Sequence, residues 1–91
     1  MEIHDRLSAL TAPQRTRILR LLSEEELGVG EVTQVVQLPQ STVSRHLKTL
    51  TKAGWAQSRR VGTSIFFRNK VFYIYSRSNW FVDIEAFYFF S

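Results

Sequence analysis

The stretch that organises this sequence covers residues 38–53 and reads LPQSTVSRHLKTLTKA. Its apolar residues Val43, Leu47 and Leu50 recur at helical spacing, which places them on one side of an α-helix. Pro39 is typical of a helix start, and Gly54 of a helix end where the backbone turns left-handed. The other side of the helix carries hydroxyls and cations and no acid: Ser41, Ser44, Arg45, Lys48 and Lys52. The sequence therefore predicts one amphipathic helix with a cationic, hydrogen-bonding outer face.

A short helix is expected directly before this one. Gly28 and Gly30 indicate a turn, and Glu31 suits the positive N-terminus of a helix whose apolar side comes from the valines that follow. Only a tight turn fits between the two helices, which is the spacing of a helix-turn-helix. The outer face of the second helix then matches a B-DNA major groove, where bases are read. A solvated surface helix is the alternative interpretation.

Two further helices are expected upstream. Apolar residues at helical spacing predict the first within residues 2–10. Thr11 and Gln14 match the S/T-x-x-E/Q capping box, which predicts the start of a second helix that ends near residue 23. The arginines of this second helix and the acidic run of residues 24–26 are expected to face solvent.

After Gly54 the period of the apolar pattern changes from 3.6 to 2. Residues 55–60 and 64–68 predict two strands joined by a turn, with Arg59 and Arg60 beside the hairpin tip. A cationic hairpin directly after a DNA-reading helix is typical of a wing, which lies along phosphates or enters the minor groove. A plain hairpin with solvated charges is the alternative.

Composition limits the classes of function. The chain has 91 residues, a net charge of +4 and a pI near 10, so we expect one domain and an anionic partner, either nucleic acid or an acidic membrane surface. The absence of cysteine excludes disulfides, thiolate metal sites and a cysteine nucleophile. No signal peptide or transmembrane stretch is recognised, so a cytoplasmic location is expected. No catalytic carboxylate pair, activated nucleophile or phosphate-binding glycine loop is recognised, so we expect no enzyme activity.

The C-terminal residues 69–91 differ from the rest of the chain. They hold nine of the twelve aromatic residues, and their charges cancel, so the +4 belongs to residues 1–68. Helical and strand patterns suit this segment equally well. We therefore divide the chain into a winged helix-turn-helix domain over residues 1–68 and an aromatic-rich segment over residues 69–91. The segment is interpreted as a dimerisation element, a cover for the winged helix, or an altered or truncated end.

Residues 5–68 resemble the ArsR/SmtB-type winged helix-turn-helix transcriptional repressors. The resemblance rests on three segments in a specific order and spacing: APQRTRILRLL, LPQSTVSRHLKTL and GTSIFFR. It implies a mainly α fold with a small β-hairpin and a sequence-specific DNA-binding repressor. It also implies a homodimer that pairs through its first and last helices on a palindromic double-stranded operator. Some relatives carry this module at the start of a longer methyltransferase chain.

The helix pattern and the resemblance together predict the DNA-binding residues. On the helix these are Gln40, Ser41, Thr42, Ser44, Arg45 and Lys48, and on the hairpin they are Arg59 and Arg60. A non-DNA-binding winged helix, used for dimerisation or protein docking, is the alternative function.

Many members of the family sense metals through a cysteine in a motif like ELCVG. This chain has Gly28 at the position of that cysteine, within ELGVG, and its histidines are His4 and His46. A packed or backbone-bonded imidazole is the expected role for His46. We therefore predict no metal site and no cofactor, and the effector is not identified by the sequence.

Overall fold

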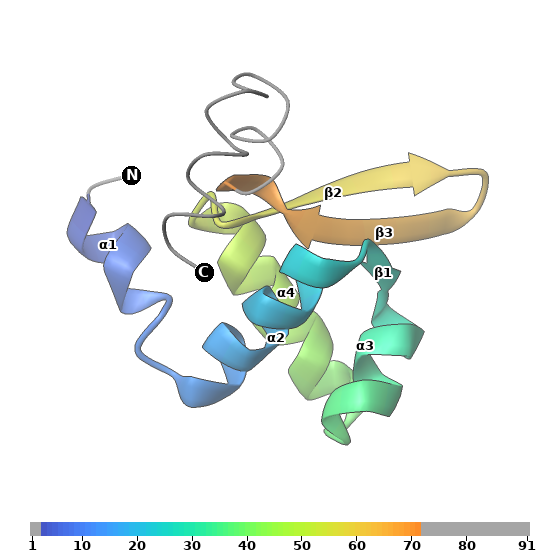
Figure 1. Cartoon of the computed structure of the whole chain (residues 1–91), viewed down its shortest axis with the longest axis horizontal. Coiled ribbons are helices and arrows are strands. Elements are labelled where there is room, and N and C mark those ends of the chain that lie inside the picture. Colours follow the sequence, from blue (N-terminus) through green and yellow to red (C-terminus); the bar gives the residue numbers. More distant parts are fainter. Residues whose placement is uncertain (1–2, 72–91) are drawn as a thin grey trace, which may run out of the picture.

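The computed structural model describes residues 3–71, which form a mainly helical domain with a small antiparallel sheet (Figure 1). Its elements are α1 (Ile3–Ser8), α2 (Pro13–Glu24), β1 (Leu27–Gly28), α3 (Val29–Val36), α4 (Gln40–Lys52), β2 (Ala56–Val61) and β3 (Ser64–Asn69). This is the order of a winged helix-turn-helix, so the predicted fold class is confirmed. The remainder of the aromatic-rich segment, after Val71, lies outside the described residues.

The core lies where α2, α3 and α4 meet. Ile18 of α2 and Val32 of α3 are fully buried, together with Val43, Leu47 and Leu50 of α4. Each helix contributes residues three or four apart, so one stripe of each faces the centre. The predicted amphipathic pattern of α4 is therefore confirmed, and packing of this stripe fixes which side of α4 faces outward.

The ends of α4 follow from its flanking residues. Pro39 is the residue just before the first turn, and its carbonyl accepts hydrogen bonds from the amides of Thr42 and Val43 at 3.0 Å each. Gly54 follows the helix with a φ of +86°, the left-handed conformation that glycine adopts without steric cost. Gln37 also has a positive φ, +60°, in the turn between α3 and α4. The tight turn of the helix-turn-helix is thus made by a residue other than glycine.

The sheet has the strand order β1-β3-β2. Strands β2 and β3 form the predicted hairpin, closed by the pair Val61 and Ser64 around a two-residue turn that includes Gly62 at a φ of +63°. Strand β1 pairs with β3 through Leu27 and Gly28, where the sequence predicted a turn. That prediction was wrong for both glycines, since Gly28 lies in β1 and Gly30 lies in the first turn of α3. A strand of two residues has no periodicity to detect and forms only when β3 pairs with it.

The start of α2 also differs from the prediction. Its N-terminal cap is Ala12, with Pro13 in the first turn, and no side chain caps it. The Thr11 hydroxyl instead donates to the carbonyl of Ser8 at 2.7 Å, which closes the end of α1. The predicted capping box of Thr11 and Gln14 is therefore wrong, because α2 begins one residue later and has Ala12 at its N-cap.

Helix α1 lies apart from the other helices (Figure 1) and contains no buried residue. Polar contacts hold it to the domain. The Trp55 indole donates to the carbonyl of Arg6 at 2.6 Å, and Nε of Arg6 donates to the carbonyl of Ala53 at 3.2 Å. The Arg6 guanidinium also lies 4.8 Å from the Trp55 ring centre, within cation–π range. Arg6 thus joins α1 to the end of α4 and the start of the hairpin.

No helix within residues 3–71 has the length and apolar character needed to span a lipid bilayer.

Candidate nucleic-acid interface

The outward side of α4 is polar and cationic. Val43, Leu47 and Leu50 point to the core, so helical geometry places Ser41, Ser44, Arg45, Lys48 and Lys52 on the opposite side, and all five are exposed. Gln40 is exposed at the first turn, whereas Thr42 is half-buried on the flank. Within residues 3–71, no carboxylate forms an ion pair with a cation of this helix. The face therefore presents hydrogen-bond donors and positive charge without local neutralisation.

The strand register separates the two wing arginines, which the sequence placed together. Arg59 lies opposite Phe66, and Arg60 lies opposite Ile65. Because successive side chains of a strand point to opposite faces, Arg60 shares its face with Phe67, beside α4, and Arg59 points to the other face. Ile65 and Phe67 share one face of the sheet through the same alternation.

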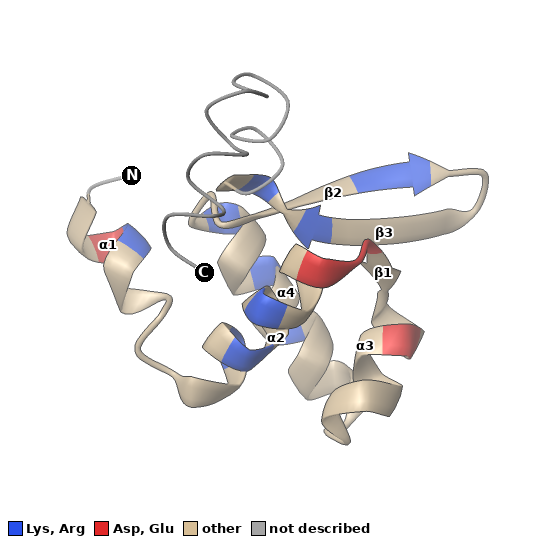
Figure 2. Cartoon of the chain, in the orientation of Figure 1, with Lys and Arg blue, Asp and Glu red and all other residues tan. Residues whose placement is uncertain are grey.

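Arg59 is bound to a carboxylate on its face of the sheet. Its Nε donates to both oxygens of Glu26 at 2.8 and 2.9 Å, and its Nη2 donates to Oε1 at 2.6 Å. Arg68 approaches the same carboxylate at 3.7 Å. Figure 2 shows this acidic turn at the end of α2, next to the basic hairpin. The expectation that residues 24–26 are simply solvated was therefore wrong for Glu26.

The environment of Glu26 favours its charged form. The hydrogen bonds from Arg59 lower its pKa, partial burial opposes them, and the charges of Arg59 and Arg68 lower it further. The Glu26 side chain is 24% exposed, against 55% for Arg59. Glu26 lies between α2 and β1, so its carboxylate ties the end of α2 to both strands of the hairpin.

His46 lies on the flank of α4 and is half-buried. Burial lowers its pKa, and the positive charges of Arg15 and Arg45 lower it further. Its Nδ1 atom is buried without a hydrogen-bond partner in the described part of the chain, so the imidazole is packed rather than backbone-bonded through this atom. Arg15 is also half-buried, with its Nε donating to the carbonyl of Ala9, so the expectation that it faces solvent was wrong.

The position that carries cysteine in the metal sensors is occupied by Gly28. Its amide donates to Oε1 of Glu31 at 2.9 Å, which fixes the start of α3. Among residues 3–71 there is no group of three or more histidine or acidic side chains arranged to hold a metal ion. The absence of a metal site in the whole chain stays a prediction.

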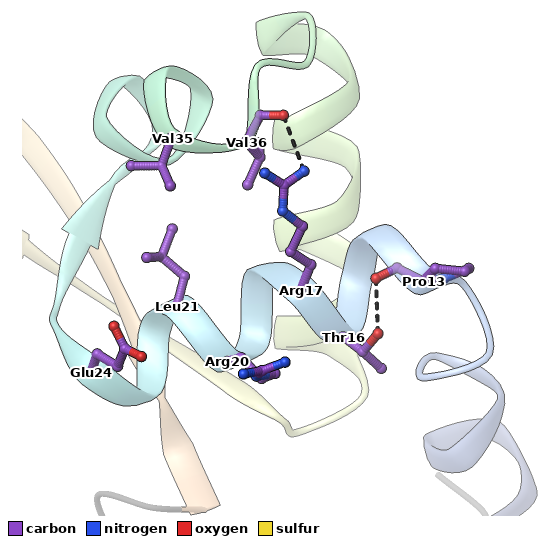
Figure 3. A pocket seen from close by; sticks show the side chains of 8 residues that line it. All are labelled: Pro13, Thr16, Arg17, Arg20, Leu21, Glu24, Val35 and Val36. Atoms are coloured by element: carbon purple, nitrogen blue, oxygen red, sulfur yellow. Dashed lines mark hydrogen bonds between the residues drawn. The ribbon is translucent and has the colours of Figure 1, made fainter.

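Surface hollows flank the helices of the described domain. One, of about 430 Å³, lies between α2 and α3, where Arg17 and Leu21 extend toward Val35 and Val36 (Figure 3). Arg17 donates to the Val36 carbonyl there at 3.4 Å, and Glu24 also lines this hollow. A second, of about 450 Å³, lies between α4, β3 and the start of α3.

The second hollow, the α4–β3 cleft, adjoins the candidate interface. It is lined by Val29, Ser44, Lys48, Thr51, Lys52 and Phe67. Ser44 and Lys48 were predicted as DNA-binding residues, whereas Lys52 and Phe67 were not. Lys52 lies four residues after Lys48, so its position on the same helix face was available from the sequence. Phe67 could be placed beside α4 only by strand pairing.

A three-helix core, an exposed cationic α4 and a β-hairpin define a winged helix-turn-helix protein. Residues 12–58 match the family described as bacterial regulatory protein, arsR family. The match covers more than half of the chain, so the chain belongs to the ArsR family.

Relatives with known names support this membership. The transcriptional activator HlyU of Vibrio cholerae is 34% identical over 61 residues, which cover 67% of this chain and 56% of HlyU. The HTH-type transcriptional repressor SmtB of Mycobacterium tuberculosis is 39% identical over 62 residues, covering 68% of this chain and 46% of SmtB. The chain therefore matches about half of the length of these two relatives.

A solved structure with a similar fold is the homodimeric winged helix-turn-helix DNA-binding domain, fragment 1–100, of Mb0332 from Mycobacterium bovis. It is described as a possible ArsR-family transcriptional regulator. The TM-score is 0.74 at 26% identity, and the similarity covers 92% of this chain and 77% of that one.

Proposed function

We propose that this chain is a sequence-specific DNA-binding repressor that acts as a homodimer on a palindromic operator. The observation that supports this most is the exposed face of α4, which carries cations and hydroxyls beside a basic hairpin. Within residues 3–71, no carboxylate forms an ion pair with these cations. A DNA-binding helix needs such a face to approach phosphates and to reach base edges. A module used only for protein docking has no need of it. A repressor of this kind acts where the DNA is, in the cytoplasm.

The residues of α4 divide by their position along the helix. Gln40, Ser41, Ser44 and Arg45 lie in its N-terminal half, which is the part that contacts base edges in helix-turn-helix proteins. Arg45 is the residue suited to a bidentate contact with a guanine. Thr42, half-buried on the flank, is suited to an apolar contact through its methyl group. Lys48, one turn further along, is suited to a phosphate.

Arg59 and Arg60 of the wing have different proposed roles. Arg60 is exposed on the sheet face beside α4, so we assign it to a phosphate near the minor groove. Arg59, held by Glu26, acts on DNA through the position of the hairpin. Alanine at Arg60 is therefore expected to weaken specific and non-specific binding by similar factors, with little change in stability. Alanine at Arg59 is expected to lower stability as well.

A second copy of the chain is proposed because one α4 reads only a half-site. In a dimer on a palindrome, binding of the first α4 holds the second α4 at a high effective concentration beside the other half-site. Helix α1 offers an apolar surface for pairing, since Ile3 is 74% exposed and Leu7 is 55% exposed. The homodimeric relative from Mycobacterium bovis is consistent with this assembly.

Selection of bound sites from a pool of random duplex DNA tests the function directly. We expect enrichment of one inverted repeat, with half-sites about one helical turn apart. A pool that shows no enrichment although the protein is folded would contradict sequence-specific binding.

The dimer is tested by sedimentation equilibrium of the full chain and of the Leu7→Asp variant, with Val35→Asp as a control that changes another exposed apolar residue. Leu7→Asp is expected to lower self-association and affinity for the inverted repeat together, because it places charge in an apolar contact. Equal self-association of the full chain and the Leu7→Asp variant would remove α1 from the proposed interface.

A further inference from the structure

The α4–β3 cleft differs in chemistry from the hollow between α2 and α3. Its base is apolar, formed by Val29 and Phe67, and its rim carries Lys48 and Lys52 one turn apart on α4. Among residues 3–71 no acidic side chain lines it, whereas Glu24 lines the other hollow. The Thr51 hydroxyl at the cleft is buried without a hydrogen-bond partner among the described residues. An apolar base under two cations fits a ligand that has an anionic group on a largely apolar body.

The cleft also has a defined place in the DNA-binding arrangement. It lies between α4 and the hairpin, and the side chain of Arg60 shares the sheet face of Phe67. A helix in the major groove and a hairpin at the adjacent minor groove have one sugar–phosphate strand between them, because that strand is the border of the two grooves. The cleft is the surface of the protein that this strand would meet.

We infer that the α4–β3 cleft is a binding site for the sugar–phosphate strand that separates the two grooves. Lys48 and Lys52 bind its phosphates, and Val29 and Phe67 contact the apolar faces of its deoxyriboses. This inference rests on the proposed function and adds three residues to the interface: Lys52, Val29 and Phe67. The phosphate contacts of Lys48 and Lys52 also fix the height of α4 over the groove, because phosphate contacts set the register in which base contacts are made.

The first test removes one cation from the cleft and one from elsewhere. Lys52→Ala is compared with Arg20→Ala, an exposed cation on α2 that lines the other hollow. Binding of a fluorescein-labelled random-sequence duplex is measured by anisotropy at about 50 and about 200 mM salt. One lost phosphate contact lowers the salt exponent by about 0.9, so the ratio of the two Kd values should fall about threefold for Lys52→Ala. The Arg20→Ala variant should keep the ratio of the wild-type protein.

The second test places a charge at the base of the cleft. Val29 is the first residue of α3, where an acid is compatible with the helix dipole, so Val29→Glu should fold. Val29→Gln has the same shape without the charge and serves as the control, with thermal unfolding measured for both. We expect Val29→Glu to raise the Kd for the duplex at least about tenfold above that of Val29→Gln, because like charges then meet across the contact.

The outcomes separate this inference from the proposed function. A wild-type chain that does not bind duplex DNA would overturn both. If the wild type binds, equal salt dependence of Lys52→Ala and Arg20→Ala would remove Lys52 from the contact. Equal affinities of Val29→Glu and Val29→Gln would remove the cleft base from it. Either equality overturns the cleft as a strand-binding site and leaves DNA binding through the rest of α4 intact.

Discussion

Replacing Glu26 by Gln tests whether one carboxylate holds the hairpin to the helical core. The substitution keeps the shape of the side chain and removes the charge that binds the Arg59 guanidinium through three hydrogen bonds of 2.6–2.9 Å. Exposed ion pairs contribute about 0.2–1 kcal/mol, because solvent screens them. Arg59 is 55% exposed, which limits the contribution, but the fork geometry and the approach of Arg68 place it near the upper end of this range. We expect Glu26→Gln to lower the free energy of unfolding by about 1 kcal/mol at neutral pH.

The effect should depend on pH in a defined direction. The Arg59 hydrogen bonds hold the pKa of Glu26 below its ordinary value of 4.5. A carboxyl group with a lowered pKa in the folded state stabilises the protein above its unfolded-state pKa, and this stability is lost as the pH falls through the folded-state pKa. The difference between wild type and Glu26→Gln should therefore be complete above about pH 5.5, roughly one unit above the unfolded-state pKa, and disappear in strong acid.

Urea unfolding followed by circular dichroism at neutral and acidic pH measures this difference. For a domain of this size, about 1 kcal/mol corresponds to a change of about 4–8 °C in Tm, so thermal unfolding gives an independent check. Glu25→Gln is the matched control, since it removes an exposed carboxylate one residue earlier in the chain. Equal stability of the wild type and Glu26→Gln at neutral pH, or a difference that persists unchanged in acid, would refute the argument.

Three other substitutions and one addition test separate parts of the structure. Arg45→Ala is expected to lower affinity for the operator by about 1–3 kcal/mol and to relax the preference at one base position. Lys48→Ala should instead weaken binding to all sequences alike and lower the salt exponent by about 0.9. Competition binding at two salt concentrations distinguishes the two variants. Trp55→Phe removes the 2.6 Å hydrogen bond to the Arg6 carbonyl and should lower the free energy of unfolding by about 1 kcal/mol, measured in urea; an unchanged midpoint would mean that α1 is not held by this contact. Zinc, cadmium or arsenite at micromolar concentration should leave a protein–DNA complex intact in an anisotropy titration, and stoichiometric release of DNA would reveal a site built from other ligands.

Local pattern was sufficient for the helices that carry an apolar stripe. The recurrence of Val43, Leu47 and Leu50 predicted both the existence of α4 and the side that it buries, because a period of 3.6 is a property of the chain itself. Gly54 marked the helix end for an equally local reason, its left-handed φ. The candidate DNA-binding face therefore followed from the sequence, since it consists of the α4 residues that lie opposite the buried stripe.

The position of each residue in the fold decided what the sequence predicted wrongly. The helix start at Pro13 leaves Ala12, and not Thr11, at the N-cap of α2, and the Thr11 hydroxyl donates to the Ser8 carbonyl at the end of α1. Glu26 belonged to a run of three acids that looked alike, and pairing of the strands brought Arg59 and Arg68 to only this one. Such choices depend on distances across the fold, which spacing along the chain does not contain.

The sequence by itself determined the helix-turn-helix, the presence of the hairpin and the charge of the outer face of α4, because each depends on residues within a few positions of one another. The tertiary structure decided the short strand at Gly28, the opposite directions of Arg59 and Arg60, and the cleft that Phe67 and Lys52 both line. These features depend on the register of β3 against its two neighbours. A shift of one residue in that register turns every side chain of the strand to the other face, so it is set by packing of the whole domain rather than by local pattern.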